Sequence, residues 1–137
     1  MAATPCTVLI VEDSPIQALA LQQTLEQKGL RVLRALDGCT GVAMAERYRP
    51  DVVVLDVQMP KMNGLEACRR LKQNPVTQNI PIVMLTAHGE PATLTQGLDL
   101  GAVDFIPKDA FSDTVLLETL RQLRVLDDGL RSGNAQG

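Results

Sequence analysis

The 137-residue chain is predicted to be an α/β domain in which helices cover both faces of a doubly wound, five-stranded parallel sheet. Residues 7–11 (TVLIV) and 52–56 (VVVLD) are continuous apolar runs, a pattern typical of strands buried on both faces. Strand-like and helix-like segments alternate along the whole chain, which favours parallel strands joined by right-handed crossovers. Both runs lead into acids, Glu12-Asp13 and Asp56, at the sheet edge where open α/β folds bind ligands.

The segment after the first strand carries clear signals for a helix start. Ser14 suits the N-cap, Pro15 suits the first helical position, and Gln17 follows three residues after the cap. Gly29 can adopt the left-handed backbone conformation that commonly ends a helix, so we expect this helix to end there. The helix should turn an apolar stripe toward the core, formed by Ala18, Leu21 and Leu25.

The next elements surround the central strand 52–56. Residues 31–35 (RVLRA) predict a short strand near the sheet edge, and Asp37-Gly38 predicts a turn. Residues 40–48 predict a helix that ends before Pro50, and residues 64–72 predict another. The apolar content of the first of these helices is Val42, Ala43 and Ala45.

The last third of the chain supplies two strands and two helices. Residues 82–86 (IVMLT) predict a buried strand that ends on Thr86, and residues 104–107 predict a short strand that leads to Lys108. Between them, residues 91–100 predict the least stable helix, because Gly97 lies inside it.

The final helix is expected to begin at an N-cap, Ser112, with Phe111 packed against Leu116. Its inward stripe should consist of Leu116, Leu120 and Leu123. We expect a single domain over residues 1–128, because the polar, glycine-rich residues 129–137 are typical of a disordered tail.

Composition narrows the class of protein. With 45% hydrophobic and 21% charged residues and no long apolar run, the chain is typical of a globular protein without membrane insertion, and its N-terminus is no secretory signal. A net charge of -3 without a basic cluster argues against nucleic-acid binding. The cysteines, Cys6, Cys39 and Cys68, are odd in number and widely spaced, which favours reduced thiols and a cytoplasmic location over a redox switch.

Chemically active side chains follow four of the predicted strands, and parallel strands bring them to one edge. They are Glu12, Asp13, Asp56, Thr86 and Lys108. Clustered carboxylates need a compensating cation, and oxygen ligands without histidine or cysteine favour a hard ion such as Mg²⁺. Asp56 stands alone on its strand, so it is the candidate nucleophile for a phosphoryl group, which Thr86 and Lys108 would stabilise.

These motifs together resemble the response-regulator receiver domain (CheY-like) of two-component signalling. The resemblance covers residues 7 to about 126 and rests on the acid pair in LIVEDSP, the motif LDVQMPKMNG, the hydroxyl in MLTA and the lysine in FIPK. It implies a flavodoxin-like sheet with strand order 2-1-3-4-5. It also implies a signalling switch whose only chemistry is its own phosphorylation and dephosphorylation, and which is not an enzyme with turnover.

The resemblance also assigns roles to residues. It implies that Asp56 accepts a phosphoryl group from a histidine kinase or phosphotransfer protein, and that Mg²⁺, or Mn²⁺ in its place, is bound by Glu12, Asp13, Asp56 and the backbone carbonyl of Gln58. Thr86, Lys108 and Phe105 would bind the phosphoryl group or switch, and Gln58 and His88 would tune dephosphorylation. A downstream protein target and a phosphorylation-dependent homodimer are the expected further partners.

One motif departs from the family pattern. The family usually places a proline after the lysine through a cis bond, whereas here Pro107 precedes Lys108 and Asp109 follows it. Because a cis bond without proline is costly, the loop from Lys108 to Phe111 is expected to take another path.

Three functions remain open from the sequence. The first is a stand-alone phospho-accepting receiver, expected because little sequence follows the last predicted helix. The second is an aspartyl-phosphate hydrolase, which Gln58 disfavours, since that class generally needs an acid two residues after the nucleophile. The third is an unphosphorylated pseudo-receiver used as a binding or dimerisation module. The complete set of pocket residues disfavours it, whereas the altered loop after Lys108 mildly favours it.

Overall fold

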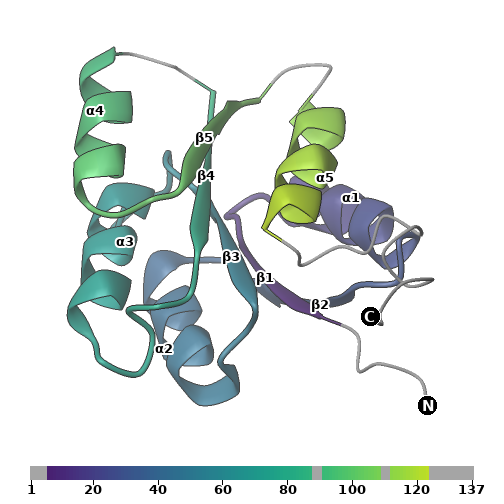
Figure 1. Cartoon of the computed structure of the whole chain (residues 1–137), viewed down its shortest axis with the longest axis horizontal. Coiled ribbons are helices and arrows are strands. Elements are labelled where there is room, and N and C mark those ends of the chain that lie inside the picture. Colours follow the sequence, from purple (N-terminus) through teal and green to yellow (C-terminus); the bar gives the residue numbers. More distant parts are fainter. Residues whose placement is uncertain (1–5, 88–90, 109–111, 124–137) are drawn as a thin grey trace.

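The computed structural model describes residues 6–87, 91–108 and 112–123, and in this part of the chain five parallel strands form one sheet (Figure 1). The strands are ordered β2-β1-β3-β4-β5, which confirms the predicted topology. All five strands have the predicted bounds: β1 (Thr7–Val11), β2 (Arg31–Ala35), β3 (Val52–Asp56), β4 (Ile82–Thr86) and β5 (Asp104–Pro107).

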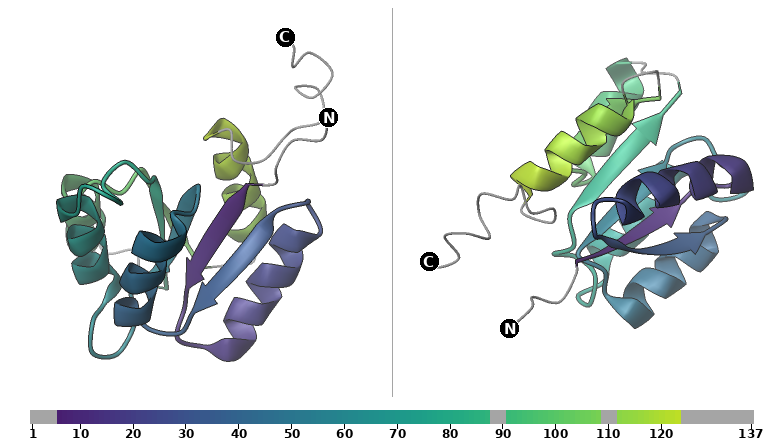
Figure 2. Two further views of the ribbon diagram at one scale, coloured as in Figure 1. Left: turned by 90° about the horizontal axis from the view of Figure 1, so that it is seen from below. Right: turned by 90° about the vertical axis from the view of Figure 1, so that its right-hand side faces the viewer.

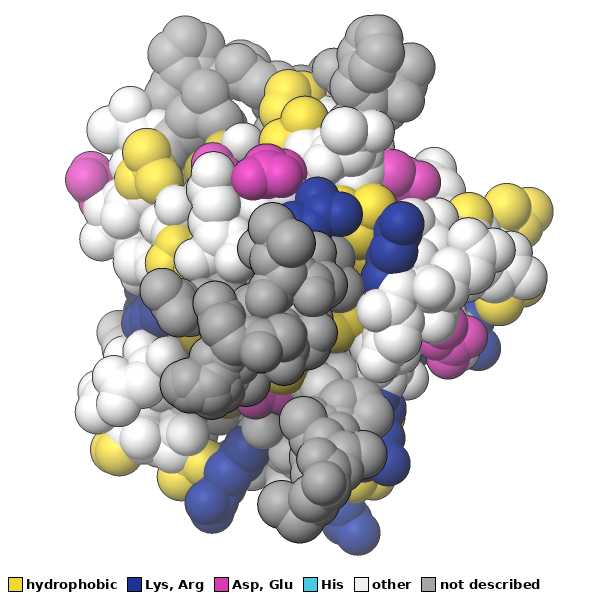
Figure 3. Space-filling model, turned by 45° about the vertical axis from the view of Figure 1, so that its right-hand side comes forward, with side chains coloured by type: hydrophobic (Ala, Val, Ile, Leu, Met, Phe, Trp, Pro, Cys, Tyr) yellow, Lys and Arg dark blue, Asp and Glu magenta, His cyan; other side chains and the backbone are white. Residues whose placement is uncertain are grey.

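A helix follows each strand, as expected for right-handed crossovers between parallel strands. The helices are α1 (Pro15–Glu26), α2 (Gly38–Tyr48), α3 (Gly64–Gln73), α4 (Pro91–Asp99) and α5 (Ser112–Gln122). Helices α1 and α5 lie on one face of the sheet, and α2, α3 and α4 lie on the other (Figures 1 and 2). On the face of the molecule that Figure 3 shows, acidic, basic and apolar side chains are interspersed.

The sheet separates the core into two layers, because successive residues of a strand point to opposite faces. Leu9 and Val53 pack under α2, α3 and α4, whereas Val8 and Val54 pack under α1 and α5. The central strands β3 and β4 are buried at every residue, which explains their unbroken apolar sequence. The predicted stripe of α1 is buried as expected, and it consists of Ala18, Leu21 and Leu25.

The structure corrects some helix details. Helix α2 begins at Gly38, two residues before the predicted start, because the Asp37 side chain accepts a hydrogen bond from the Thr40 backbone N–H at 2.7 Å and caps the helix. Ala43 is exposed, and Met44 packs against the core instead. Helix α5 begins at Ser112 itself, one residue before the start that a cap at this serine predicts.

Some predictions fall outside the described residues. These are the disordered tail at 129–137, the packing of Phe111, the site of His88 and the path of the loop 109–111. Among the residues that are described, no helix is both long and apolar enough to cross a membrane.

Gly97 in α4 is explained by packing. A Cβ atom at this position would overlap Cε2 and Cζ of the Phe105 ring and would lie 3.3 Å from Sδ of Met84. The partly buried ring therefore lies directly against the backbone of α4. The sequence identified Gly97 as a weak point of the helix, and the structure shows that the glycine allows β5 and α4 to approach.

We predict that Gly97→Ala lowers the free energy of unfolding. Replacing glycine with alanine inside a helix stabilises the helix by about 1 kcal/mol. Overpacking a core contact destabilises a protein by about 1–3 kcal/mol. We expect a cost near the upper end of this range, because the added methyl group must displace an aromatic ring. The measurement is urea unfolding, with exposed Thr95→Ala in the same helix as the control. A gain of stability in Gly97→Ala would show that helix propensity outweighs the ring contact.

Candidate functional site

Two neighbouring strands bring buried carboxylates to one edge of the sheet. Strand β1 pairs with β3 in parallel, with Val11 opposite Leu55, so the residues that follow, Glu12 and Asp56, lie at adjacent strand ends. Only 4% of the Glu12 surface and 3% of the Asp56 surface are exposed. Burying a charge requires a partner of opposite sign.

The third acid, Asp13, completes a compact cluster. One oxygen from each of Glu12, Asp13 and Asp56 lies within 4.8 Å of the other two, and Asp13 is exposed while the others are buried. Three ionised carboxylates at this separation repel one another unless cations compensate their charge.

Lys108, at the end of β5, supplies one cation. Its Nζ lies 2.6 Å from Oε1 of Glu12 and 3.1 Å from Oδ2 of Asp56. Its backbone N–H donates to the carbonyl oxygen of Thr86 at 2.8 Å, which fixes the lysine beside the end of β4. One ammonium therefore contacts both buried carboxylates.

The pKa of Lys108 lies above its ordinary value of 10.5. Burial is the largest single cause and acts to lower this pKa, but the hydrogen bonds to Glu12 and Asp56 and the charges of these two acids together raise it by more. The lysine therefore stays protonated and keeps its contacts with both acids at neutral pH.

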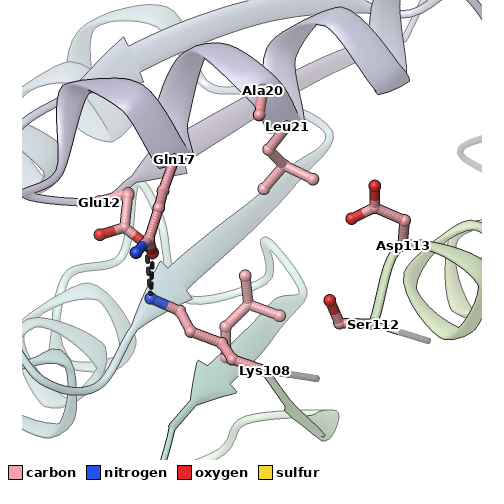
Figure 4. Close-up of a pocket in the computed structure, with 8 residues that line it drawn as sticks. Glu12, Gln17, Ala20, Leu21, Lys108, Ser112 and Asp113 are labelled. Carbon is pink, nitrogen blue, oxygen red and sulfur yellow. Dashed lines mark hydrogen bonds and ion pairs between the residues drawn. The ribbon is translucent and has the colours of Figure 1, made fainter. Parts of the chain in front are cut away.

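Gln17 is a neighbour of the site that the sequence did not identify. Its backbone N–H donates to Oγ of Ser14 at 3.3 Å, as expected for the predicted cap. Its side chain does not turn back to Ser14. Instead, Oε1 of Gln17 accepts a hydrogen bond from Nζ of Lys108 at 3.1 Å (Figure 4), and the Ser14 N–H donates to Oε2 of Glu12 at 3.1 Å. The sequence signal at Gln17 was that of a helix start, so the contact with Lys108 was missed.

A pocket of about 340 Å³ opens between α1 and α5 beside Lys108 (Figure 4). Polar and apolar residues both line it: Glu12, Gln17, Ala20, Leu21, Leu85, Lys108, Ser112 and Asp113.

The buried hydroxyl of Thr86 lies on the other side of the site. Gln58, two residues after Asp56, donates from its backbone N–H to Oδ1 of Asp56 at 3.3 Å and from Nε2 to Oγ1 of Thr86 at 3.3 Å. Its Oε1 accepts the backbone N–H of Ala87 at 3.1 Å. Gln58 thus connects the acid at the end of β3 with the hydroxyl at the end of β4.

The predicted switch aromatic lies apart from the acids. Phe105 is on β5, opposite Met84 of β4, and its ring packs with the core layer under α4. His88 lies outside the described residues.

The acid cluster has the donor chemistry for a divalent metal. Three carboxylates face one lysine, so their formal charges of -3 and +1 leave -2 at the site. The cluster offers oxygen ligands alone, which suit Mg²⁺. Glu12, Asp13 and Asp56 are therefore the residues that fit such an ion.

Comparison with known proteins identifies the family of the chain. Residues 8–121 match the family described as the response regulator receiver domain. The response regulator PleD from Caulobacter vibrioides is 38% identical over 133 residues, which are 95% of this chain and 29% of PleD. The chain thus spans less than a third of that relative.

Two solved structures share the fold along nearly their whole length. The chemotaxis protein CheY4 from Vibrio cholerae has a TM-score of 0.82 and 32% identity, over 88% of this chain and 99% of CheY4. The receiver domain of a sensor histidine kinase from Pseudomonas aeruginosa has a TM-score of 0.79 and 28% identity, over 88% and 98% of the two chains. That structure is described as having a magnesium ion coordinated in its active-site cleft.

We predict that the raised pKa of Lys108 makes stability depend on pH at the alkaline end. The contribution of Lys108 to the free energy of unfolding is complete below pH 10.5, the pKa of the unfolded state. It is lost as the pH rises toward the higher pKa of the folded state, because the folded chain then holds a proton that the unfolded chain has released. Urea unfolding at a series of alkaline pH values should show this decline in the wild type and a shallower one in Lys108→Met. Equal slopes in both proteins would contradict the prediction.

Proposed function

The chain belongs to the response regulator receiver domain family of two-component signalling, and we propose that Asp56 is its phosphoryl acceptor. The observation that carries the proposal is a carboxylate that is 3% exposed and paired with Lys108 at 3.1 Å, next to two further acids. The donor would be the phosphohistidine of a histidine kinase or of a phosphotransfer protein.

The reaction requires an ionised nucleophile. A carboxylate oxygen of Asp56 attacks phosphorus, the bond from phosphorus to the imidazole nitrogen breaks, and the product is an acyl phosphate on Asp56 with the histidine released. The ammonium of Lys108 is already 3.1 Å from Oδ2 of Asp56, so it lies close to where the negative phosphoryl oxygens would be. The hydroxyl of Thr86 would bind another of these oxygens.

The acids around Asp56 would hold Mg²⁺, with Mn²⁺ as a substitute. Glu12, Asp13 and Asp56 supply carboxylate oxygens, and we propose the backbone carbonyl of Gln58 as a further ligand. When bound, the ion would supply positive charge that offsets the repulsion between these acids and the incoming phosphoryl group. The chain's own part is to place three oxygens within 4.8 Å and to keep Lys108 beside them.

Phosphorylation would then change a protein-binding surface. We propose that Thr86 moves toward the phosphoryl group and that the ring of Phe105 turns away from Gly97 into the space that this movement leaves. Helix α4, strand β5 and helix α5 would repack in response. Large apolar side chains on or next to these elements are exposed, which suits docking of a protein: Leu98, Val103 and Val115.

The output of the switch would be docking to a downstream protein in the cytoplasm or formation of a homodimer. Gln58 and His88 would tune how fast the phosphoryl group is lost. A receiver that switches in this way is a signalling protein and not an enzyme with turnover.

We predict that acetyl phosphate with Mg²⁺ adds one phosphoryl mass to the wild-type protein and none to Asp56→Asn. Asparagine keeps the size of the side chain but removes the nucleophilic oxygen anion. Intact-mass spectrometry measures the product, and Asp51→Asn, at an exposed acid before β3, is the matched control. Equal labelling of wild type and Asp56→Asn would refute Asp56 as the acceptor. Partner binding or self-association that ignores both Mg²⁺ and Asp56→Asn would support the pseudo-receiver instead.

We also predict that Asp13→Asn weakens Mg²⁺ binding by about tenfold or more, because the site loses one of three anionic ligands. Isothermal titration calorimetry measures the affinity. Asp37→Asn is the control, since asparagine can still cap α2 and Asp37 is not part of the acid cluster. An unchanged affinity in Asp13→Asn would exclude this residue as a ligand.

A further inference from the structure

The side chain of Gln58 bridges two strand ends at the site. Its Oε1 lies 3.1 Å from the backbone nitrogen of Ala87, and its Nε2 lies 3.3 Å from Oγ1 of Thr86. A backbone N–H can only donate, so the oxygen of the amide must face Ala87 and its nitrogen must face Thr86. The orientation of the amide group is therefore determined by its partners.

This bridge occupies a backbone donor at the end of β4, the strand next to the one that ends at Asp56. The backbone N–H of Gln58 itself contacts Oδ1 of Asp56 at 3.3 Å, so the bridge starts beside the nucleophile. A phosphoryl group brings several strong acceptor oxygens, and they require donors close to Asp56. Ala87 offers such a donor at the end of β4, and in this structure that donor is bound to the acceptor oxygen of Gln58.

We propose that the Gln58 side chain is a latch that occupies part of the phosphoryl-binding site in the phosphate-free protein. Its Oε1 takes the place of a phosphoryl oxygen on the Ala87 N–H, and its Nε2 holds the Thr86 hydroxyl in the resting position. The amide group must swing away before the site can close around a phosphoryl group. This inference rests on the proposed function of Asp56, and it is separate from any effect of Gln58 on hydrolysis.

The two hydrogen bonds of the Gln58 side chain are weak enough to break and form again reversibly. Gln58 is an exposed residue, so water competes for its amide, and each of its two hydrogen bonds contributes modestly. Lys108 differs in this respect, because it is partly buried and contacts two carboxylates. Loss of both latch bonds is expected to change the affinity for a phosphoryl mimic by about three- to thirtyfold.

The test uses beryllofluoride, a phosphoryl mimic that binds an aspartate carboxylate without being hydrolysed, in the presence of Mg²⁺. Because no hydrolysis occurs, the equilibrium affinity reports the cost of opening the latch alone. Gln58→Met keeps the length of the side chain but forms neither bond, and it should bind beryllofluoride about three- to thirtyfold more tightly than the wild type. Gln58→Ala should behave in the same way.

Two measurements separate the latch from a general structural effect. Gln73→Met, at an exposed glutamine in the last turn of α3, should bind the mimic as the wild type does. In the phosphate-free protein, the backbone amide of Ala87 should exchange with solvent faster in Gln58→Met than in the wild type, as measured by NMR, because its acceptor has been removed.

The outcomes distinguish this inference from the proposed function. If the wild type binds beryllofluoride and neither Gln58→Met nor Gln58→Ala binds it more tightly, the latch is refuted while Asp56 remains the acceptor. If neither the wild type nor any variant binds the mimic, the proposed function and the latch fall together. Tighter binding that persists when Gln58→Met is combined with Asp56→Asn would also refute the latch, since the mimic would then bind elsewhere.

Discussion

The ion pairs of Lys108 are the interaction on which the site depends. Glu12 and Asp56 are almost completely buried, and an unpaired buried charge costs several kcal/mol. Lys108 follows β5, whereas Asp56 ends β3, so the lysine must reach past the end of β4, to which its backbone N–H is bonded. The network therefore ties together the ends of β1, β3, β4 and β5, and it holds the carboxyl groups of Glu12 and Asp56 in place.

A continuous path of contacts leads from this network to helix α4. Gln58 contacts Asp56 and Thr86, and Thr86 ends the strand in which Met84 lies opposite Phe105. The Phe105 ring in turn lies against the backbone of α4 at Gly97. A path of this kind transmits a change only if one of its elements has two stable arrangements. The partly buried Phe105 ring lies in a space that a Cβ atom at position 97 would fill, so a movement of the ring would change its contact with α4.

Strand positions were predictable because each strand has a local signature. The runs at 52–56 and 82–86 are buried at every residue, and the run at 7–11 is buried after its first residue, so every side chain between the first and last residues of each strand is apolar. Helix starts were less predictable because one motif suits two structures. The pair Asp37-Gly38 is typical both of a turn and of an N-cap followed by the first helical residue. In the structure the Asp37 side chain accepts a hydrogen bond from the Thr40 N–H and is the N-cap of α2.

The sequence by itself determined the strands, their parallel order of connection and the acids, hydroxyl and lysine at their ends, because periodicity and strand-end chemistry are local properties. Only the tertiary structure decided which of these groups touch. Gln17 meets Lys108 across 91 residues and Gln58 meets Thr86 across 28, and neither pair follows from helix or strand propensity. Such contacts depend on strand order and on the reach of individual side chains between neighbouring strand ends, and these are fixed only when the sheet is assembled.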